Sequence, residues 1–198
     1  MLKGAASVVG AGPYIGVMTY GLHGRACPLI ALGNIFAVAG CSSRPPLAIV
    51  PHVDIPRFMG DWYVIACIPT RIERRAYAPR ESYRLEGQDR VRTVFEFRDG
   101  GFDGPLKRYT PTGFVRADGG GAVWGMQFVW PIRADYRIMY VDSDYKLTVI
   151  GRQKRDYAWI MARAPRIAEA DYDRLRALLE SQGYDVSALH RMPQPESP

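Results

Sequence analysis

Short apolar and aromatic runs separated by turn residues fill the chain from Gly60 to Arg163. They recur roughly every 10 to 14 residues, which is the spacing of antiparallel hairpins. The eight runs span residues 62–68, 81–85, 91–97, 112–117, 122–130, 136–142, 146–151 and 157–163. Eight short strands in this order predict an all-β fold, either a closed barrel or a sandwich.

The pattern changes to a helical one after Ala164-Pro165. Tyr172, Leu175, Leu178 and Leu179 recur at spacings of three and four, which predicts a helix over 168–182 with Gly183 as its stop. A single amphipathic helix after eight strands is expected to pack its apolar stripe on the outside of the sheet. Residues 183–192 offer a further short strand, and residues 194–198 form a loose tail.

The first 40 residues have the composition of a secretory signal peptide. They contain no acidic residue, and Arg25 precedes a mostly apolar stretch, 26–40, that ends in small residues. This stretch has 15 residues and is shorter than the roughly 20 that span a bilayer. Met18 is an alternative start that gives a signal of the usual length.

The residues around Cys41 predict a lipid anchor. Val38-Ala39-Gly40-Cys41 resembles the bacterial lipobox, in which the cysteine is acylated and becomes the mature N-terminus. The alternative is an ordinary signal peptide followed by an incidental cysteine. Ser42 in place of Asp resembles the sorting pattern of outer-membrane lipoproteins, so we expect the protein in the outer membrane, on its periplasmic side. The predicted organisation is a signal peptide over 1–40, a lipidated tether over 41–56, a domain over 57–193 and the tail.

Charge and residue usage exclude several classes of function. The net charge is +6, and residues 41–198 carry 24 basic and 20 acidic side chains once Lys3 and Arg25 are set aside. This excess is mild and forms no basic run, so we expect no nucleic-acid partner. The three histidines, the three cysteines and the absence of phosphate-loop glycine patterns favour neither a metal site nor a cofactor.

Three motifs carry a resemblance to a known family. Gly60-Asp61-Trp62-Tyr63 opens the first strand, 141–145 (VDSDY) forms the turn between strands six and seven, and Arg163 closes the eighth strand. In this order and at these separations they resemble the lipocalin family over residues 53–193. Segments 55–75, 135–151 and 155–165 are similar to bacterial outer-membrane lipocalins and to their animal relative apolipoprotein D.

The resemblance implies an eight-stranded up-and-down antiparallel β-barrel with one C-terminal α-helix packed outside. It also implies that Trp62 lies at the closed end with Arg163 across its indole, as a structural plug of the barrel bottom and not as a ligand site. Such a shielded cation–π contact is worth on the order of 1–2 kcal/mol.

Alternation along the strands predicts which side chains face the interior. Counting from Trp62 places Val64, Ala66 and Ile68 inward, with Ile65 and Cys67 outward beneath the helix. The predicted ligand-binding lining consists of Tyr83, Phe95, Phe97, Met126, Phe128, Trp130, Tyr136, Ile138, Tyr140, Tyr157 and Trp159. Trp124 and Met161 share these faces. The lining suits an acyl chain; the alternative is that these residues fill a packed core.

Basic residues follow the first strand, where the lipocalin resemblance places a loop over the open mouth. Arg71, Arg74 and Arg75 are predicted to meet the anionic headgroup of a ligand, and Lys107 and Arg108 lie on the next stretch of the mouth. The alternative is a solvated loop that rests on anionic lipid heads.

These features predict a non-enzymatic, membrane-anchored lipocalin that stores or carries a fatty acid or lysophospholipid. A first alternative is a lipid-modifying enzyme, for which Glu81 and Glu96 are the strand carboxylates to check, although a salt-bridge or rim role is expected for both. A second is a ligand-free barrel that acts through protein partners by an exposed apolar patch at its mouth. Whether the chain is a monomer or a homodimer is left open.

Overall fold

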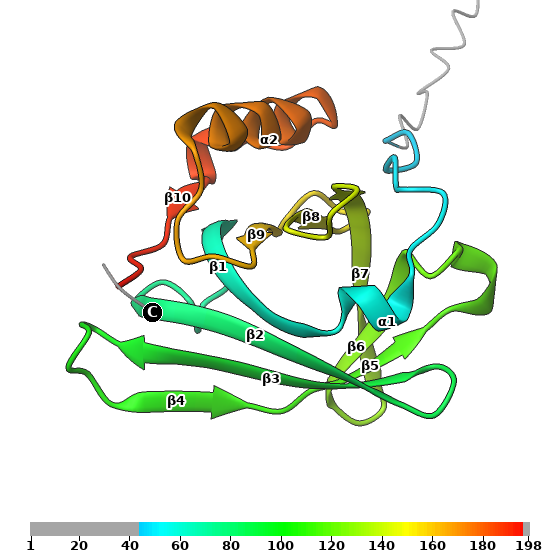
Figure 1. Ribbon diagram of the computed structural model, residues 1–198, viewed down its shortest axis with the longest axis horizontal. Helices are drawn as coiled ribbons and strands as arrows, with labels where there is room; N and C mark the ends of the chain where they lie inside the picture. The colour runs from blue at the N-terminus through cyan, green and yellow to red at the C-terminus, as the bar shows by residue number, and fades with distance from the viewer. Residues whose placement is uncertain (1–43, 196–198) are drawn as a thin grey trace, which may run out of the picture. The chain divides into compact units, whose positions relative to one another are not determined.

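The computed structural model describes residues 44–195 and contains a closed antiparallel barrel (Figure 1). The chain enters it through a short helix, α1 (Ile55–Phe58). The strands are β1 (Gly60–Ile68), β2 (Ala76–Glu86), β3 (Arg90–Asp99), β4 (Leu106–Tyr109), β5 (Thr112–Val115), β6 (Val123–Val129), β7 (Ile132–Val141), β8 (Leu147–Gly151), β9 (Ala158–Ala162) and β10 (His190–Arg191). The strands pair in the order β10-β1-β2-β3-β5-β6-β7-β8-β9, with β4 also on β3, and β1 pairs with β9 to close the barrel. The predicted fold is confirmed.

The wall of the barrel has eight strands because β4 and β5 are two halves of one of them. Both pair with β3, and Thr110-Pro111 lies between them. Proline has no N–H to give to the ladder, which interrupts the strand at that point. The hydrophobic pattern predicted β5 but missed β4, because Leu106, Lys107 and Arg108 are all exposed and show no alternation.

Strand β10 is the short strand that the tail was predicted to offer. It pairs with Ala66 and Cys67, whereas β2 pairs with β1 only from Gly60 to Tyr63. The tail therefore occupies an edge of β1 that β2 has left. Gln194, the first residue of the predicted loose tail, donates to the carbonyls of Val64 and Pro79 at 2.8 and 3.1 Å and links the two strands.

Helix α2 (Glu169–Ser181) lies outside the barrel, over β1, β8 and β9 (Figure 1). Tyr172, Leu175 and Leu179 are buried against the outer faces of Ile65 and Ile160, as the apolar stripe predicted. Tyr184, just after the helix, donates from its hydroxyl to the Arg152 carbonyl and accepts from the Arg152 N–H.

The described part of the predicted tether is packed on the barrel. Leu47 and Val53 are buried, the Val50 N–H donates to the Ile138 carbonyl at 3.1 Å, and the Val53 N–H donates to the Gly120 carbonyl at 2.9 Å. Residues 1–43, including the predicted signal and Cys41, lie outside the described residues.

Two irregularities reverse the side-chain direction predicted on β1 and β7. The register shifts between Val64 and Ala66, and Ala66 and Ile68 therefore pack outside under α2, while Cys67 packs inside. The predicted directions of these three residues are wrong, because an extra residue in one strand turns every later side chain to the other face. Burial raises the pKa of the inward Cys67 thiol, which keeps it protonated.

The same effect moves Tyr140 out of the barrel. The register shifts between Ile138 and Tyr140; Ile138 lies in the interior, but Tyr140 packs on the outside, beneath the guanidinium of Arg174. The predicted inward position of Tyr140 is wrong for this reason.

The end of the barrel near α1 is closed by Trp62 and Arg163. Trp62 is fully buried, its indole N–H donates to the Phe58 carbonyl at 2.9 Å, and the Arg163 guanidinium lies 3.8 Å from the centre of a Trp62 ring. Nη2 of Arg163 also donates to the carbonyls of Arg57, Phe58 and Met59, and Nη1 donates to that of Asp61. The guanidinium thus ties α1 to the start of β1 across the barrel end.

We expect Arg163→Ala to destabilise the barrel by about 3 kcal/mol, since it removes a shielded cation–π contact and leaves several carbonyls without a donor. Urea unfolding followed by tryptophan fluorescence measures the change. Arg174→Ala is the matched control, because that guanidinium lies over Tyr140 at 5.1 Å on the exposed helix. Equal losses in both variants would contradict the closing role.

Candidate functional site

A cavity of about 370 Å³ enters the barrel from the end opposite α1. In an up-and-down barrel alternate loops share an end, so 69–75, 100–105, 130–131 and 152–157 form its mouth. The cavity is lined by Thr70, Arg71, Ile72, Glu73, Glu81, Phe95, Met126, Phe128, Ala134, Asp135, Tyr136, Arg152, Tyr157 and Trp159. Its volume lies near the lower end of the range for small-molecule sites, roughly 300–1,000 Å³.

Of the predicted lining, the structure brings Phe95, Met126, Phe128, Tyr136, Tyr157 and Trp159 together around this cavity. Tyr83, Phe97 and Ile138 lie inside the barrel but in its packed part. Trp130 stands at the tip of the β6–β7 hairpin with 82% of its surface exposed, so its predicted inward position is wrong. Alternation fails there because the strand ends at Val129 and the chain turns.

The closed half of the barrel is an aromatic core. Phe58, Trp62, Tyr83, Trp124 and Tyr136 are buried with neighbouring ring centroids 5.0–6.5 Å apart. Offset and edge-to-face contacts of this kind add about 0.5–1.5 kcal/mol each beyond area burial. The predicted alternative of a packed core therefore describes this half of the barrel, and the cavity occupies the other half.

Glu81 lies where the cavity meets this core. It is on the same face of β2 as Tyr83, whose hydroxyl donates to Glu81 Oε2 and also lies 2.8 Å from the hydroxyl of Tyr136. Burial raises the pKa of the Glu81 carboxyl to about 7; the hydrogen bond from Tyr83 opposes this shift and the negative charge of Glu73 adds to it. Burial also raises the pKa of both tyrosines.

The expectation of a salt-bridge or rim role is wrong for Glu81 and confirmed for Glu96. Glu96 pairs with Arg80 and Arg108 on the outer face of the sheet. No ion pair of the described residues involves Glu81, which lies one position away on the partner strand, opposite Phe95. The alternation of side chains along a strand contained the signal, because Glu81 lies two residues before Tyr83, which was predicted to face inward.

Glu73 forms part of the cavity wall and was not predicted. It is 4% exposed, its Oε1 accepts from the indole N–H of Trp159 at 2.7 Å, and its Oε2 accepts from the Thr70 N–H at 2.8 Å. The carboxylate thus folds the loop 69–75 down onto β9. Sequence alone gives no sign of this, because a lone acid among loop arginines resembles a solvated side chain.

The three predicted headgroup arginines do not share one location. Arg71 lines the cavity, whereas Arg74 and Arg75 line a separate hollow outside the barrel, between loop 69–75 and the tail that carries β10. Arg75 is also 3.5 Å from Asp99. Lys107 and Arg108 project from the exposed strand β4.

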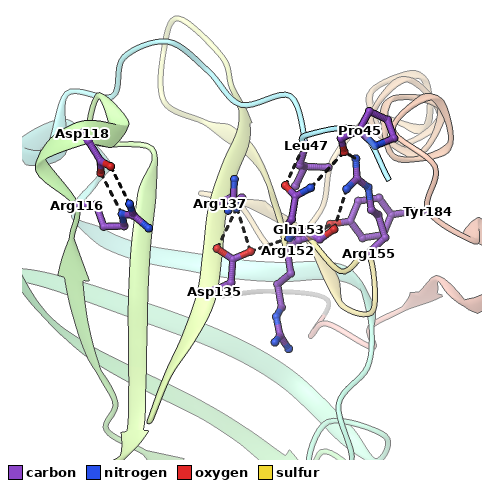
Figure 2. A network of polar contacts seen from close by, with 10 residues as sticks. All are labelled: Pro45, Leu47, Arg116, Asp118, Asp135, Arg137, Arg152, Gln153, Arg155 and Tyr184. Atoms are coloured by element: carbon purple, nitrogen blue, oxygen red, sulfur yellow. Dashed lines mark hydrogen bonds and ion pairs between the residues drawn. The ribbon is translucent and has the colours of Figure 1, made fainter. Parts of the chain in front are cut away.

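Arg152 is a mouth residue that the sequence reasoning missed. Its guanidinium pairs with Asp156 at 3.4 Å and lies over Tyr157, but its Nε is buried without a hydrogen-bond partner among the described residues. Figure 2 shows its side chain extending away from Asp135, which accepts from Arg137 Nε and from the Gln153 N–H. Asp135 is therefore satisfied by neighbours, and Arg152, which already pairs with Asp156, has its Nε left without a partner beside the cavity.

The large exposed apolar side chains of the described residues all lie at the mouth. They come from the loop after β1, from the β3–β4 hairpin and from the β6–β7 hairpin. They are Ile72, Phe102, Leu106, Phe128, Val129, Trp130 and Ile132. Four of them, Phe128, Val129, Trp130 and Ile132, share the β6–β7 hairpin, and an exposed apolar patch of this kind marks a surface that meets another molecule or a membrane.

No group of histidine, cysteine and acidic side chains within residues 44–195 is placed to hold a metal ion. None of the helices in this part of the chain has the length and apolarity to cross a membrane.

The raised pKa of Glu81 makes stability depend on pH. The folded state holds this proton more tightly than the unfolded chain, so the contribution is complete below pH 4.5 and is lost as the pH rises through about 7. Relative to Glu81→Gln, we expect the free energy of unfolding of the natural protein to fall by up to about 3 kcal/mol across that window. Urea unfolding of both proteins at several pH values measures it, and a constant difference would contradict the burial of this carboxyl.

Comparison with known proteins agrees with this architecture. Residues 53–194 match the lipocalin-like domain. The chain is 29% identical to the outer membrane lipoprotein Blc of Escherichia coli K12 over 87% of this chain and 99% of that protein. It is 26% identical to apolipoprotein D of Macaca fascicularis over 80% and 85% of the two chains. Insecticyanin from the tobacco hornworm Manduca sexta has the same fold, with a TM-score of 0.61 and 15% identity over 77% of this chain and 86% of that one. The chain therefore belongs to the lipocalin family.

Proposed function

We propose that this lipocalin binds a single-chain amphiphile, a fatty acid or a lysophospholipid, with the acyl chain in the barrel and the anionic head at the mouth. The observation that carries the proposal is the cavity itself, which is lined by Phe95, Met126, Tyr136 and Trp159 and opens beside Arg71 and Arg152. Apolar walls below and basic groups above match the two ends of such a molecule.

Unpaired polar atoms at the mouth support a polar head at this level. The Thr70 hydroxyl and Arg152 Nε are both buried without a partner among the described residues, and both residues line the cavity. Buried polar groups are nearly always hydrogen-bonded, so these two atoms suit a ligand that supplies acceptors. A carboxylate or phosphate does so and also offsets the positive charge of the arginines.

Affinity is expected to come mainly from the chain. Each buried methylene contributes about 0.8 kcal/mol, so two methylenes change the dissociation constant roughly tenfold until the cavity is full. The cost of fixing the ligand offsets part of this gain. The contacts of the headgroup then determine the orientation of the ligand more than its affinity.

We further propose that the protein works at a membrane surface, held by a lipidated Cys41. The apolar side chains at the mouth, with Trp130 outermost, support a lipid surface as the neighbour of this end. The name of the Escherichia coli relative, an outer membrane lipoprotein, supports the outer membrane as the location. A mouth that faces lipid would let the amphiphile enter without crossing water.

Two alternatives also have a feature in their favour. A barrel that acts through a protein partner would use the same apolar patch, and a lipid-modifying enzyme would use the inward Glu81. The cavity beneath the patch favours a carrier over a packed interaction barrel. A carrier releases its ligand chemically unchanged, whereas a lipid-modifying enzyme does not. Mass analysis of the released ligand separates these two.

We expect Met126→Trp to weaken the binding of dodecanoic acid at least about tenfold, because the larger side chain fills the space that the acyl chain would occupy. Native mass spectrometry and calorimetry on the purified protein measure the loss. Tyr140→Phe is the matched control, since Tyr140 lies outside the barrel and the change should leave affinity intact. Equal affinity in all three proteins, or no uptake by any, would overturn the proposed function.

The anchor is tested by Cys41→Ser. We expect this variant in the soluble periplasmic fraction, with no acyl mass, while the natural protein is recovered with the outer membrane. An unchanged fractionation and an unacylated natural protein would both contradict the anchor.

A further inference from the structure

The floor of the cavity holds a carboxyl group without a basic partner. Glu81 lines the cavity, and among the described residues the hydrogen bond from the Tyr83 hydroxyl is the one given to its carboxyl. A carboxyl in an apolar site is costly unless its oxygens are hydrogen-bonded. A leucine or methionine at this position would extend the apolar wall at no such cost. We therefore look to ligand recognition for the role of this acid.

The neighbouring donors are already used. Tyr83 has one hydroxyl proton, which it donates to Glu81 Oε2, and the Tyr136 hydroxyl lies 2.8 Å from Tyr83 and serves as donor to it. These hydrogen bonds form a chain that ends at one oxygen of Glu81. Oε1 is left to accept from whatever occupies the cavity.

The other acids around the cavity are satisfied by the protein itself. Glu73 accepts from Trp159 and from the Thr70 N–H, and Asp135 accepts from Arg137 and from the Gln153 N–H. The basic groups, Arg71 and Arg152, lie on the mouth loops, away from the core that Tyr83 and Tyr136 form. Glu81 is thus the acid in this cavity that has an oxygen to spare, and it lies deepest.

We propose that Glu81 forms a subsite for a hydroxyl group carried on the buried part of the ligand chain, so that the barrel prefers hydroxylated over unsubstituted acyl chains. This inference rests on the proposed function. A hydroxyl both donates and accepts, so it pairs with the carboxyl whether that group is protonated or ionised. An ammonium group fits less well, because it would have to pass two arginines at the mouth.

The test is a competition between chain pairs on the purified protein. Decanoic, dodecanoic and tetradecanoic acids are each mixed in equal amounts with their ω-hydroxy counterparts, and native mass spectrometry gives the bound ratio. Three lengths are used because the hydroxyl must reach Glu81 while the carboxylate stays at the mouth. We expect the hydroxylated chain to be preferred about three- to tenfold at one length at least, the range that one net hydrogen bond provides.

Variants of Glu81 assign the preference to its carboxyl. Glu81→Leu should reverse it in favour of the unsubstituted chain, because a hydroxyl would then be buried without a partner. Glu81→Gln should keep the preference for the hydroxylated chain, because the amide also accepts and donates hydrogen bonds. Tyr140→Phe is the control, because Tyr140 packs outside the barrel and its exchange should leave the ratio unchanged.

The outcomes separate this inference from the function beneath it. If both chains are taken up and the unsubstituted one binds equally or more tightly at every length, the hydroxyl subsite is overturned and the carrier function stands. A hydroxyl preference that survives Glu81→Leu overturns it as well. No uptake of any chain overturns both proposals. Should Glu81→Leu fail to fold, the ¹³C resonance of the Glu81 carboxyl in the natural protein decides: it should move further with the hydroxylated chain than with the unsubstituted one, and equal shifts would overturn the subsite.

Discussion

The contact between Arg163 and Trp62 determines how the rest of the barrel is used. It joins the end of β9 to the start of β1 at the closed end, and the guanidinium also holds the carbonyls of α1. Because this end is sealed, Phe58, Tyr83 and Trp124 can pack as a solid aromatic core above it. The remaining volume is open from one side alone, which makes it a pocket with a floor and a mouth.

The polar groups of the cavity are ordered along its depth. Arginines stand at the mouth, apolar rings form the walls, and the Glu81 carboxyl with its two tyrosines lies at the floor. A buried acid of this kind lowers stability above neutral pH and offers nothing to packing. Its presence is easier to understand as part of ligand recognition than as part of the fold. The glutamate on the wall, Glu73, has a structural task, since it fastens the mouth loop to Trp159.

The sequence was sufficient for the fold and for much of the lining. Strand runs and the apolar stripe of α2 depend on local periodicity, which survives in every regular part of the chain. Periodicity fails where the backbone is irregular: a shift in β1 turned Cys67 inward, and a shift in β7 turned Tyr140 outward. Trp130 was misplaced because the strand had already ended, and no pattern in the residues marks these points.

Charged residues were harder to place than apolar ones. Glu81 was expected in a salt bridge or on the rim, although its parity with Tyr83 already pointed inward. Arg152 was missed since it lies just beyond the end of β8, where alternation carries no information. The loop arginines were expected to act together, yet only Arg71 reaches the cavity, because the fold of loop 69–75 depends on the contacts of Glu73. Tertiary contacts of this kind cannot be predicted from the local sequence.

The central claim is that an acyl chain lies in the barrel with its end on the Glu81 floor. The most direct measurement is an isotope-filtered NMR experiment on the purified protein with ¹³C-labelled dodecanoic acid. The account predicts contacts from the terminal methyl group to Met126 and Tyr136, and from the first methylenes to Tyr157 near the mouth. Contacts confined to Trp130, Val129 and the other exposed side chains of the hairpin would contradict it, because the chain would then lie on the surface and the barrel would remain empty.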